Sequence, residues 1–109
     1  MVMYTYGQIV TALGGPYATK ARPVLILQNP KFKTGDSVII APLTSVQNCE
    51  INTRIVVRPS KNNGLDRDCF VEVDKITAIM VTAIGPVVGM LEESTLSEVT
   101  AMAVSLVSP

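Results

Sequence analysis

The stretch Arg22-Pro23-Val24-Leu25-Ile26-Leu27-Gln28 is followed, after the segment Asn29–Asp36, by Ser37-Val38-Ile39-Ile40-Ala41-Pro42-Leu43. Apolar runs of this length are typical of strands that are buried on both faces. The segment between them is polar and contains a proline and a glycine, as a turn does. We therefore predict strands over Pro23–Gln28 and Ser37–Leu43.

Weaker strand signals lie on either side of these two runs. In the longest of them, Val71 and Val73 alternate with Glu72 and Asp74, which is the period of a strand with one solvated face. Glu72 is therefore expected to face solvent. The further strands are expected over Gly7–Leu13, Thr53–Arg58, Cys69–Ile79 and Val87–Met90.

The last segment changes to helical spacing, which predicts a helix of about three or four turns. Its apolar positions recur every three or four residues: Leu96, Val99, Ala103 and Leu106. The helix start has two candidates, a capping box at Thr95-x-x-Glu98 and a first turn over residues 92–94. Five or six short strands with one terminal helix predict a mainly β (α+β) fold, a small antiparallel barrel-like domain.

Length and composition exclude several classes of protein. The 109 residues suffice for one domain, residues 1–109, with one core. A content of 48% hydrophobic and 17% charged residues excludes an intrinsically disordered chain. No apolar run approaches the ~20 residues of a membrane helix, and the N-terminus lacks the basic region of a signal peptide. We therefore expect a cytoplasmic protein that does not bind membranes.

Two absences narrow the chemistry. The sequence has no histidine, which excludes an imidazole base and a His-ligated metal. The two cysteines, Cys49 and Cys69, form no C-x-x-C pair, so a zinc site is not expected. Without a secretory signal they are expected to be reduced thiols. We expect no metal and no cofactor.

Charge is unevenly distributed although the net charge is zero. Residues 20–67 carry eight basic and three acidic side chains, whereas residues 81–109 carry three acidic side chains and no basic one. A local basic face suits a nucleic-acid surface. Ordinary solvated charges explain the same pattern, so composition leaves both interpretations open.

Several motifs together resemble the MazF/PemK family of toxin endoribonucleases. The most specific part is Arg22-Pro23 with its apolar strand, followed by a second strand that ends in Pro42-Leu43-Thr44-Ser45. The resemblance extends along nearly the whole chain. The other matching segments are Gly7-Gln8-Ile9-Val10, Asn63-Gly64-Leu65, Val73-Asp74-Lys75-Ile76 and residues 84–91.

The resemblance implies an SH3-like barrel of the CcdB/PemK type with a C-terminal helix, assembled as a homodimer. It implies the toxin of a type II toxin–antitoxin system, controlled by a cognate antitoxin. Such toxins cleave single-stranded RNA at short sequences without a metal, by attack of the ribose 2′-OH on the adjacent phosphate. The family's catalytic arginine and threonine correspond to Arg22 and Thr44.

The residue types at these positions suit that reaction. A guanidinium presents several fixed donors to the charge that builds on a five-coordinate phosphorus. Thr44 and Ser45 offer two hydroxyls at a strand end, and Lys20 adds a cation close to Arg22. A surface arginine that begins a strand, and a turn whose hydroxyls satisfy its own backbone, explain the same residues without function.

The loop before Arg22 departs from the family pattern. Members usually carry a carboxylate there as a candidate base for the 2′-OH, but Gly14–Ala21 contains no acid. General-base help typically contributes about 10²–10⁴-fold. We take Asp74 as the candidate base, with a purely structural acid as the competing interpretation. The other acids considered are Glu72, Asp66 and Asp68.

Proteins that bind single-stranded RNA usually stack bases on exposed aromatic side chains. Tyr17 lies in the loop before Arg22, and Phe32 lies in the turn after the first apolar run. We expect both loops to flank the Arg22 end of the site, with Lys31 contacting phosphate beside Phe32. Coverage of apolar barrel edges is the alternative for both rings.

Two other functions are considered. Toxins of the related CcdB type share the fold and inhibit DNA gyrase through a C-terminal tail that contains tryptophan. This sequence has no tryptophan and ends Val107-Ser108-Pro109, which argues against that function. A catalytically weak member that mainly binds its antitoxin is the second alternative, because the loop acid is missing.

Overall fold

The computed structural model describes residues 4–13 and 21–109. Within these residues, seven strands precede one α-helix, and two short 3-10 helices interrupt the later strands. The elements are β1 (Gln8–Ala12), β2 (Arg22–Ile26), β3 (Ser37–Thr44), β4 (Arg54–Val57), β5 (Cys69–Glu72), η2 (Val73–Lys75), β6 (Thr77–Met80), η3 (Val81–Ala83), β7 (Ile84–Met90) and α1 (Glu93–Val107).

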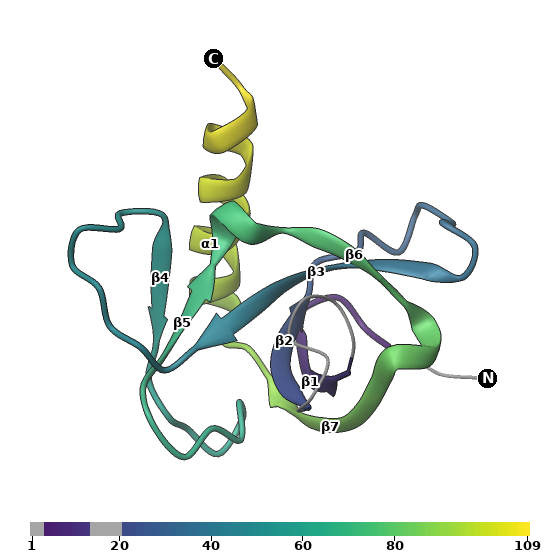
Figure 1. Ribbon diagram of the computed structural model, residues 1–109, viewed down its shortest axis with the longest axis horizontal. Coiled ribbons are helices and arrows are strands. Elements are labelled where there is room, and N and C mark those ends of the chain that lie inside the picture. The colour runs from purple at the N-terminus through teal and green to yellow at the C-terminus, as the bar shows by residue number, and fades with distance from the viewer. Residues whose placement is uncertain (1–3, 14–20) are drawn as a thin grey trace.

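All strand pairs are antiparallel, in the order β4-β5-β3-β2-β1-β7, and β6 also pairs with β3. Figure 1 shows β1, β2, β3, β6 and β7 curled into a ring, with β4 and β5 to one side of it and α1 above β5. The prediction of a mainly β, antiparallel fold with a C-terminal helix is confirmed.

Each central strand contributes to two apolar cores, one on each face of the sheet. Along β2, Val24 and Ile26 pack into one core, whereas Leu25 packs into the other. This follows from the alternation of side chains along a strand. The second core also holds Val99 of α1, so the helix covers that face. The prediction that β2 is buried on both faces is confirmed.

The expected continuous strand over Cys69–Ile79 is wrong. The pairs Leu43–Val71 and Ile40–Thr77 lie three residues apart along β3. Along the segment from β5 to β6 that pairs with β3, they lie six residues apart. The three surplus residues coil into η2, which keeps Val73 in the core. The apolar–polar alternation continues through η2 in the sequence, so the pattern does not reveal the interruption.

Helix α1 begins at Glu93, which confirms the candidate first turn over residues 92–94 and excludes the capping box at Thr95. The carboxylate of Glu92, the N-cap residue, accepts hydrogen bonds from Ser60 Oγ (2.6 Å) and Asn63 Nδ2 (3.0 Å). Asn63 is fully buried, and its Oδ1 accepts from two backbone N–H groups of the same loop. The β4–β5 connection is thus fixed onto the start of the helix.

Gly64, in the Asn-Gly-Leu segment, cannot be replaced without strain. Its φ is +70°, and a Cβ there would lie 2.1 Å from the carbonyl oxygen of Val88. Only glycine combines this backbone conformation with such close approach. The segment therefore has a structural role.

Both cysteines are free, as predicted, with Cys49 exposed and Cys69 buried. Burial raises the pKa of the Cys69 thiol. The negative charges of Asp66 and Asp68 also raise this pKa, and the positive charge of Arg67 lowers it. In the described part of the chain, no helix is long and apolar enough to cross a membrane.

Candidate active site

The register of β2 and β3 brings Arg22, at the start of β2, and Thr44, at the end of β3, to the same end of the hairpin. The two strands pair through Val24–Pro42, Leu25–Ala41 and Ile26–Ile40. The pairing ends at Val24–Pro42, and the same register continued by two residues would set Arg22 opposite Thr44, on the face that Val24 shares by alternation. Arg22 is exposed and Thr44 is half-buried. We call Arg22, Thr44 and Ser45 the open end of the hairpin.

Thr44 is held by the turn that follows it. The backbone N–H of Val46 donates to Thr44 Oγ1 at 3.2 Å, and Ser45 between them is exposed. A threonine hydroxyl can accept and donate at once. Because Thr44 Oγ1 accepts this bond, its hydroxyl proton can be donated to a different group.

Arg54, at the start of β4, was not singled out from the sequence. Its Nη1 donates to the carbonyl oxygen of Val46 at 2.8 Å, and its Nη2 lies 3.3 Å from Glu72 Oε2. Its buried Nε has no hydrogen-bond partner among the described residues, an arrangement that costs about 1–3 kcal/mol. The cross-strand register of β4 and β5 creates these contacts, and the sequence does not specify that register.

The expectation that Glu72 faces solvent is wrong. Its side chain is only 12% exposed, as is that of Arg54. The two residues are direct cross-strand partners in β4 and β5. Lys75 Nζ approaches the same carboxylate at 3.7 Å. Glu72 is thus engaged by two cations and holds an internal ion pair.

Asp74 lies in η2 and is also engaged. Its carboxylate accepts hydrogen bonds from Thr53 Oγ1 at 3.0 Å and Lys75 Nζ at 3.3 Å. Partial burial opposes ionisation, but the bonds from Thr53 and Lys75 together with the lysine charge hold the pKa of Asp74 below its ordinary value. A carboxylate with a lowered pKa is a weaker base. These contacts favour the structural interpretation of Asp74 over the role of general base.

Lys31 and Phe32 lie at the turn end of the hairpin, which we define as residues 29–36. The expectation that this turn flanks Arg22 is wrong, because an antiparallel hairpin puts its turn at the end opposite its free ends. The length of β3 from Ser37 to Thr44 is about 23 Å at ~3.3 Å per residue. Phe32 is 66% exposed.

A buried side chain, Gln28, fixes the turn end. Its Nε2 donates to the carbonyl oxygen of Phe32 at 3.1 Å, and its Oε1 accepts from the backbone N–H of Ile39 at 3.1 Å. The backbone N–H of Lys31 donates to Asn29 Oδ1 at 2.9 Å. Lys31 and Phe32 are therefore presented on an ordered turn with exposed side chains. Tyr17 and Lys20, the two other predicted RNA contacts, lie outside the described residues.

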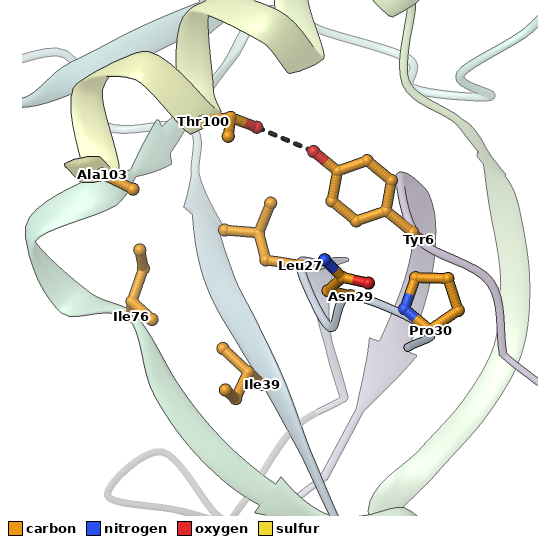
Figure 2. Close-up of a pocket in the computed structure, with 8 residues that line it drawn as sticks. All are labelled: Tyr6, Leu27, Asn29, Pro30, Ile39, Ile76, Thr100 and Ala103. Carbon is orange, nitrogen blue, oxygen red and sulfur yellow. Dashed lines mark hydrogen bonds between the residues drawn. The ribbon is translucent and has the colours of Figure 1, made fainter. Parts of the chain in front are cut away.

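A hollow of about 440 Å³ lies between α1 and the sheet (Figure 2). Figure 2 shows the apolar side chains of Leu27, Ile39 and Ile76 around it, and the bond between Tyr6 Oη and Thr100 Oγ1 (2.7 Å) at one edge. Among the described residues that line it, none belongs to the site predicted from the sequence. The candidate active site is therefore the open end and not this hollow.

Comparison with known proteins decides the family. Residues 6–106 match the family of PemK-like, MazF-like toxins of type II toxin–antitoxin systems. The chain belongs to this family. It is 34% identical over 89 residues to a probable endoribonuclease MazF of Mycolicibacterium smegmatis. The aligned stretch covers 81% of this chain and 82% of that protein. The chain is thus a MazF-like toxin endoribonuclease, and the gyrase-toxin alternative is not supported.

Solved structures show the same MazF-like fold. The Mycobacterium tuberculosis toxin MazF-mt6 is 28% identical, with a TM-score of 0.72 over 90% of this chain and 93% of that chain. An endoribonuclease from a mycobacterial species, in complex with its cognate antitoxin, has a TM-score of 0.80 at 22% identity over 98% of each chain. The second likeness concerns the fold alone.

Proposed function

We propose that this MazF-like toxin cleaves single-stranded RNA at short sequences without a metal, at the open end of the hairpin. The observation that supports this is the β2–β3 register, which brings Arg22 and Thr44 to the same end of the hairpin. An arginine and a hydroxyl at the same end of a hairpin can both reach one phosphate group. In this proposal the 2′-OH of the RNA attacks the adjacent phosphorus.

Arg22 is proposed to stabilise the charge of the transition state. Attack of the 2′-oxygen forms a five-coordinate phosphorus whose non-bridging oxygens carry added negative charge. A guanidinium stays charged at all relevant pH values and offers several donors in a fixed plane. Preorganised donors of this kind are typically worth about 10²–10³-fold in rate.

Thr44 is proposed to donate to the second non-bridging oxygen. Its Oγ1 already accepts the N–H of Val46, so its own proton is free to point toward the phosphate. The bond from phosphorus to the 5′-oxygen breaks as the bond to the 2′-oxygen forms, while the 2′-OH proton passes to water and a proton from water reaches the leaving 5′-oxygen. The products are a 2′,3′-cyclic phosphate and a 5′-hydroxyl.

The RNA is proposed to continue from the open end along the protein surface. Ser45 is exposed beside Thr44 and offers a second hydroxyl to the backbone of the RNA. Tyr17 and Lys20 are proposed to contact RNA near Arg22. Lys31 and the exposed ring of Phe32 are proposed to bind a segment of RNA remote from the cleaved phosphate.

Two protein partners complete the proposal. A related endoribonuclease has been crystallised with its cognate antitoxin, and we propose that this chain also binds a cognate antitoxin in the cytoplasm. We further propose a homodimer, which exposed apolar side chains such as Met80 and Ile39 support. Light scattering is expected to give the mass of two chains, and the mass of one chain would contradict the dimer.

The central test is an endonuclease assay on a long single-stranded RNA in EDTA, with Arg22→Ala alongside and the cut ends mapped. Cuts at one short recurring sequence, absent with Arg22→Ala, are expected. No cuts from the folded protein would favour the weak member that mainly binds its antitoxin. Equal cutting by both proteins would show that Arg22 is not in the site.

A further inference from the structure

The loop over residues 45–53, which leaves the open end, is held at both of its ends. At its start, Arg54 Nη1 donates to the carbonyl oxygen of Val46 at 2.8 Å. At its finish, Thr53 Oγ1 donates to Asp74 Oδ1 at 3.0 Å, and the backbone N–H of Val73 donates to the carbonyl oxygen of Thr53 at 3.2 Å. The loop is therefore fixed by side chains of β4 and η2.

The ion pair behind this loop is difficult to explain by stability alone. Arg54 and Glu72 are both 12% exposed, and a buried ion pair generally adds little stability over an apolar pair of similar volume. Arg54 also leaves its buried Nε without a hydrogen-bond partner within the described residues. Such a group calls for a role other than stability.

A second Arg–acid pair on the same strands provides the contrast. Arg58 and Asp68 follow the last β4–β5 pair, Val57–Cys69, and form an ion pair whose side chains are 74% and 47% exposed. Both pairs join an arginine to a carboxylate. Arg58 donates to Asp68, whereas Arg54 donates to the carbonyl oxygen of Val46 as well as to Glu72. What distinguishes Arg54 is its contact with the turn after Thr44.

We propose that Arg54, held by Glu72, is a positioning residue for RNA cleavage, because it fixes Val46 and Val46 fixes the hydroxyl of Thr44. The bond from Arg54 ends on the carbonyl oxygen of Val46, and the N–H of the same residue donates to Thr44 Oγ1. This role rests on the proposed function, in which Thr44 donates to the phosphate.

The expected size of the effect follows from the geometry. Arg54 acts through the direction of the Thr44 proton and does not itself touch the RNA. The loss of its contact can therefore cost at most what removal of the Thr44 hydroxyl costs, about tenfold in rate for one hydrogen bond. Loss of the Arg54 contact is therefore expected to slow cleavage while leaving RNA binding in place.

The test compares two matched double variants, Arg54→Met with Glu72→Met and Arg58→Met with Asp68→Met. Each removes both charges of its pair, so neither leaves a lone charge behind. Cleavage rates are measured with saturating protein in EDTA, together with RNA affinity and thermal unfolding. The 54/72 variant is expected to cleave up to about tenfold more slowly, which is the full loss expected of Thr44→Val, with affinity within about twofold. The 58/68 variant is expected to cleave at the wild-type rate.

A double-mutant cycle with Thr44→Val separates positioning from general damage. Since Arg54 acts through Thr44, the 54/72 change is expected to add less than about twofold in the Thr44→Val background. A full additional loss there, or wild-type cleavage by a folded 54/72 variant, would overturn the role of Arg54. If the 54/72 variant does not fold, Arg54→Lys keeps the charge but lacks the planar fork, and its cleavage at the full rate would overturn the role.

The same experiments distinguish this inference from the proposed function. Thr44→Val at the wild-type rate would overturn the proposed site and the role of Arg54 with it. A slow Thr44→Val beside a full-rate 54/72 variant would leave the site intact and overturn the role of Arg54 alone.

Discussion

The two ends of the β2–β3 hairpin differ in what they present. The open end holds Arg22 and Thr44, with Ser45 beside them, whereas the turn end presents Lys31 and the exposed ring of Phe32. The first set can stabilise charge on a phosphate, and the second can only hold RNA. In the proposed function, chemistry and binding lie at opposite ends of β3, a strand about 23 Å long at ~3.3 Å per residue. Substitutions at the open end should therefore change the cleavage rate, and those at the turn end should change RNA affinity.

The largest effect is expected at the open end from Arg22→Ala. Removing the guanidinium should lower the cleavage rate at saturating protein by about 10²–10³-fold, because the charge on the phosphorane loses its main donor. Single-turnover kinetics measure this rate. Lys61→Ala, an exposed cation elsewhere on the surface, is the control. A full rate for Arg22→Ala would place the chemistry elsewhere.

Thr44→Val should lower the same rate by about tenfold. The substitution keeps the shape of the side chain and removes one hydrogen bond worth about 1–1.5 kcal/mol. RNA affinity, measured by fluorescence anisotropy, is expected to stay unchanged. A loss confined to affinity would show that Thr44 binds RNA and takes no part in the chemical step.

At the turn end, Phe32→Ala should weaken RNA binding by about fivefold. That corresponds to about 1 kcal/mol of stacking between an aromatic ring and a base. The cleavage rate at saturating protein should not change, and Phe32→Tyr should retain the affinity. A slower chemical step in Phe32→Ala would remove the distinction between the two ends.

Asp74→Asn should lower the cleavage rate by only about twofold. The amide still accepts from Thr53 Oγ1 but loses the attraction of Lys75. If Asp74 were the general base, the loss would be about 10²–10⁴-fold and the acidic limb of the pH–rate profile would disappear. Rates between pH 5 and pH 9 decide between these outcomes.

The smallest effect on activity is expected from substitution of Glu92. This residue is remote in the sequence from the open end and the turn end of the hairpin, and its contacts stabilise the fold. The hydrogen bond from Ser60 lowers the pKa of Glu92, and a hydrogen bond from Asn63 lowers it further. Partial burial of the carboxylate has the opposite, smaller effect. Its stabilising contribution is present above the ordinary carboxyl pKa of 4.5 and is lost as the pH falls through the lower folded value. Glu92→Gln should lower Tm by about 5 °C at pH 7 and by less at pH 3. An equal change at both pH values would contradict this.

The fold and the open end could be predicted because they depend on local pattern. The apolar runs of β2 and β3 identify the hairpin, and the Arg-Pro and Pro-Leu-Thr-Ser segments lie at its open end. The expectation for Phe32 is wrong because the turn that joins two antiparallel strands lies at the end of the hairpin opposite Arg22.

The contacts of Arg54, Glu72 and Asp74 could not be predicted from the sequence. They depend on the register of β4 and β5 and on the surplus residues coiled into η2. Residues 58–68 form an 11-residue connection between these strands. A tight turn would fix the register of the two strands, but a connection of this length does not. The alternation therefore predicts a solvated Glu72, although its side chain is only 12% exposed.

The most direct test of the account uses one RNA that contains a single 2′-deoxynucleotide on the 5′ side of the cleaved phosphate. In EDTA, the all-RNA substrate should be cut to a 2′,3′-cyclic phosphate and a 5′-hydroxyl, because in the proposed mechanism the 2′-OH of the RNA is itself the nucleophile. The substituted substrate should stay intact while binding with unchanged affinity. Cleavage of the substituted substrate at the same position would contradict the account.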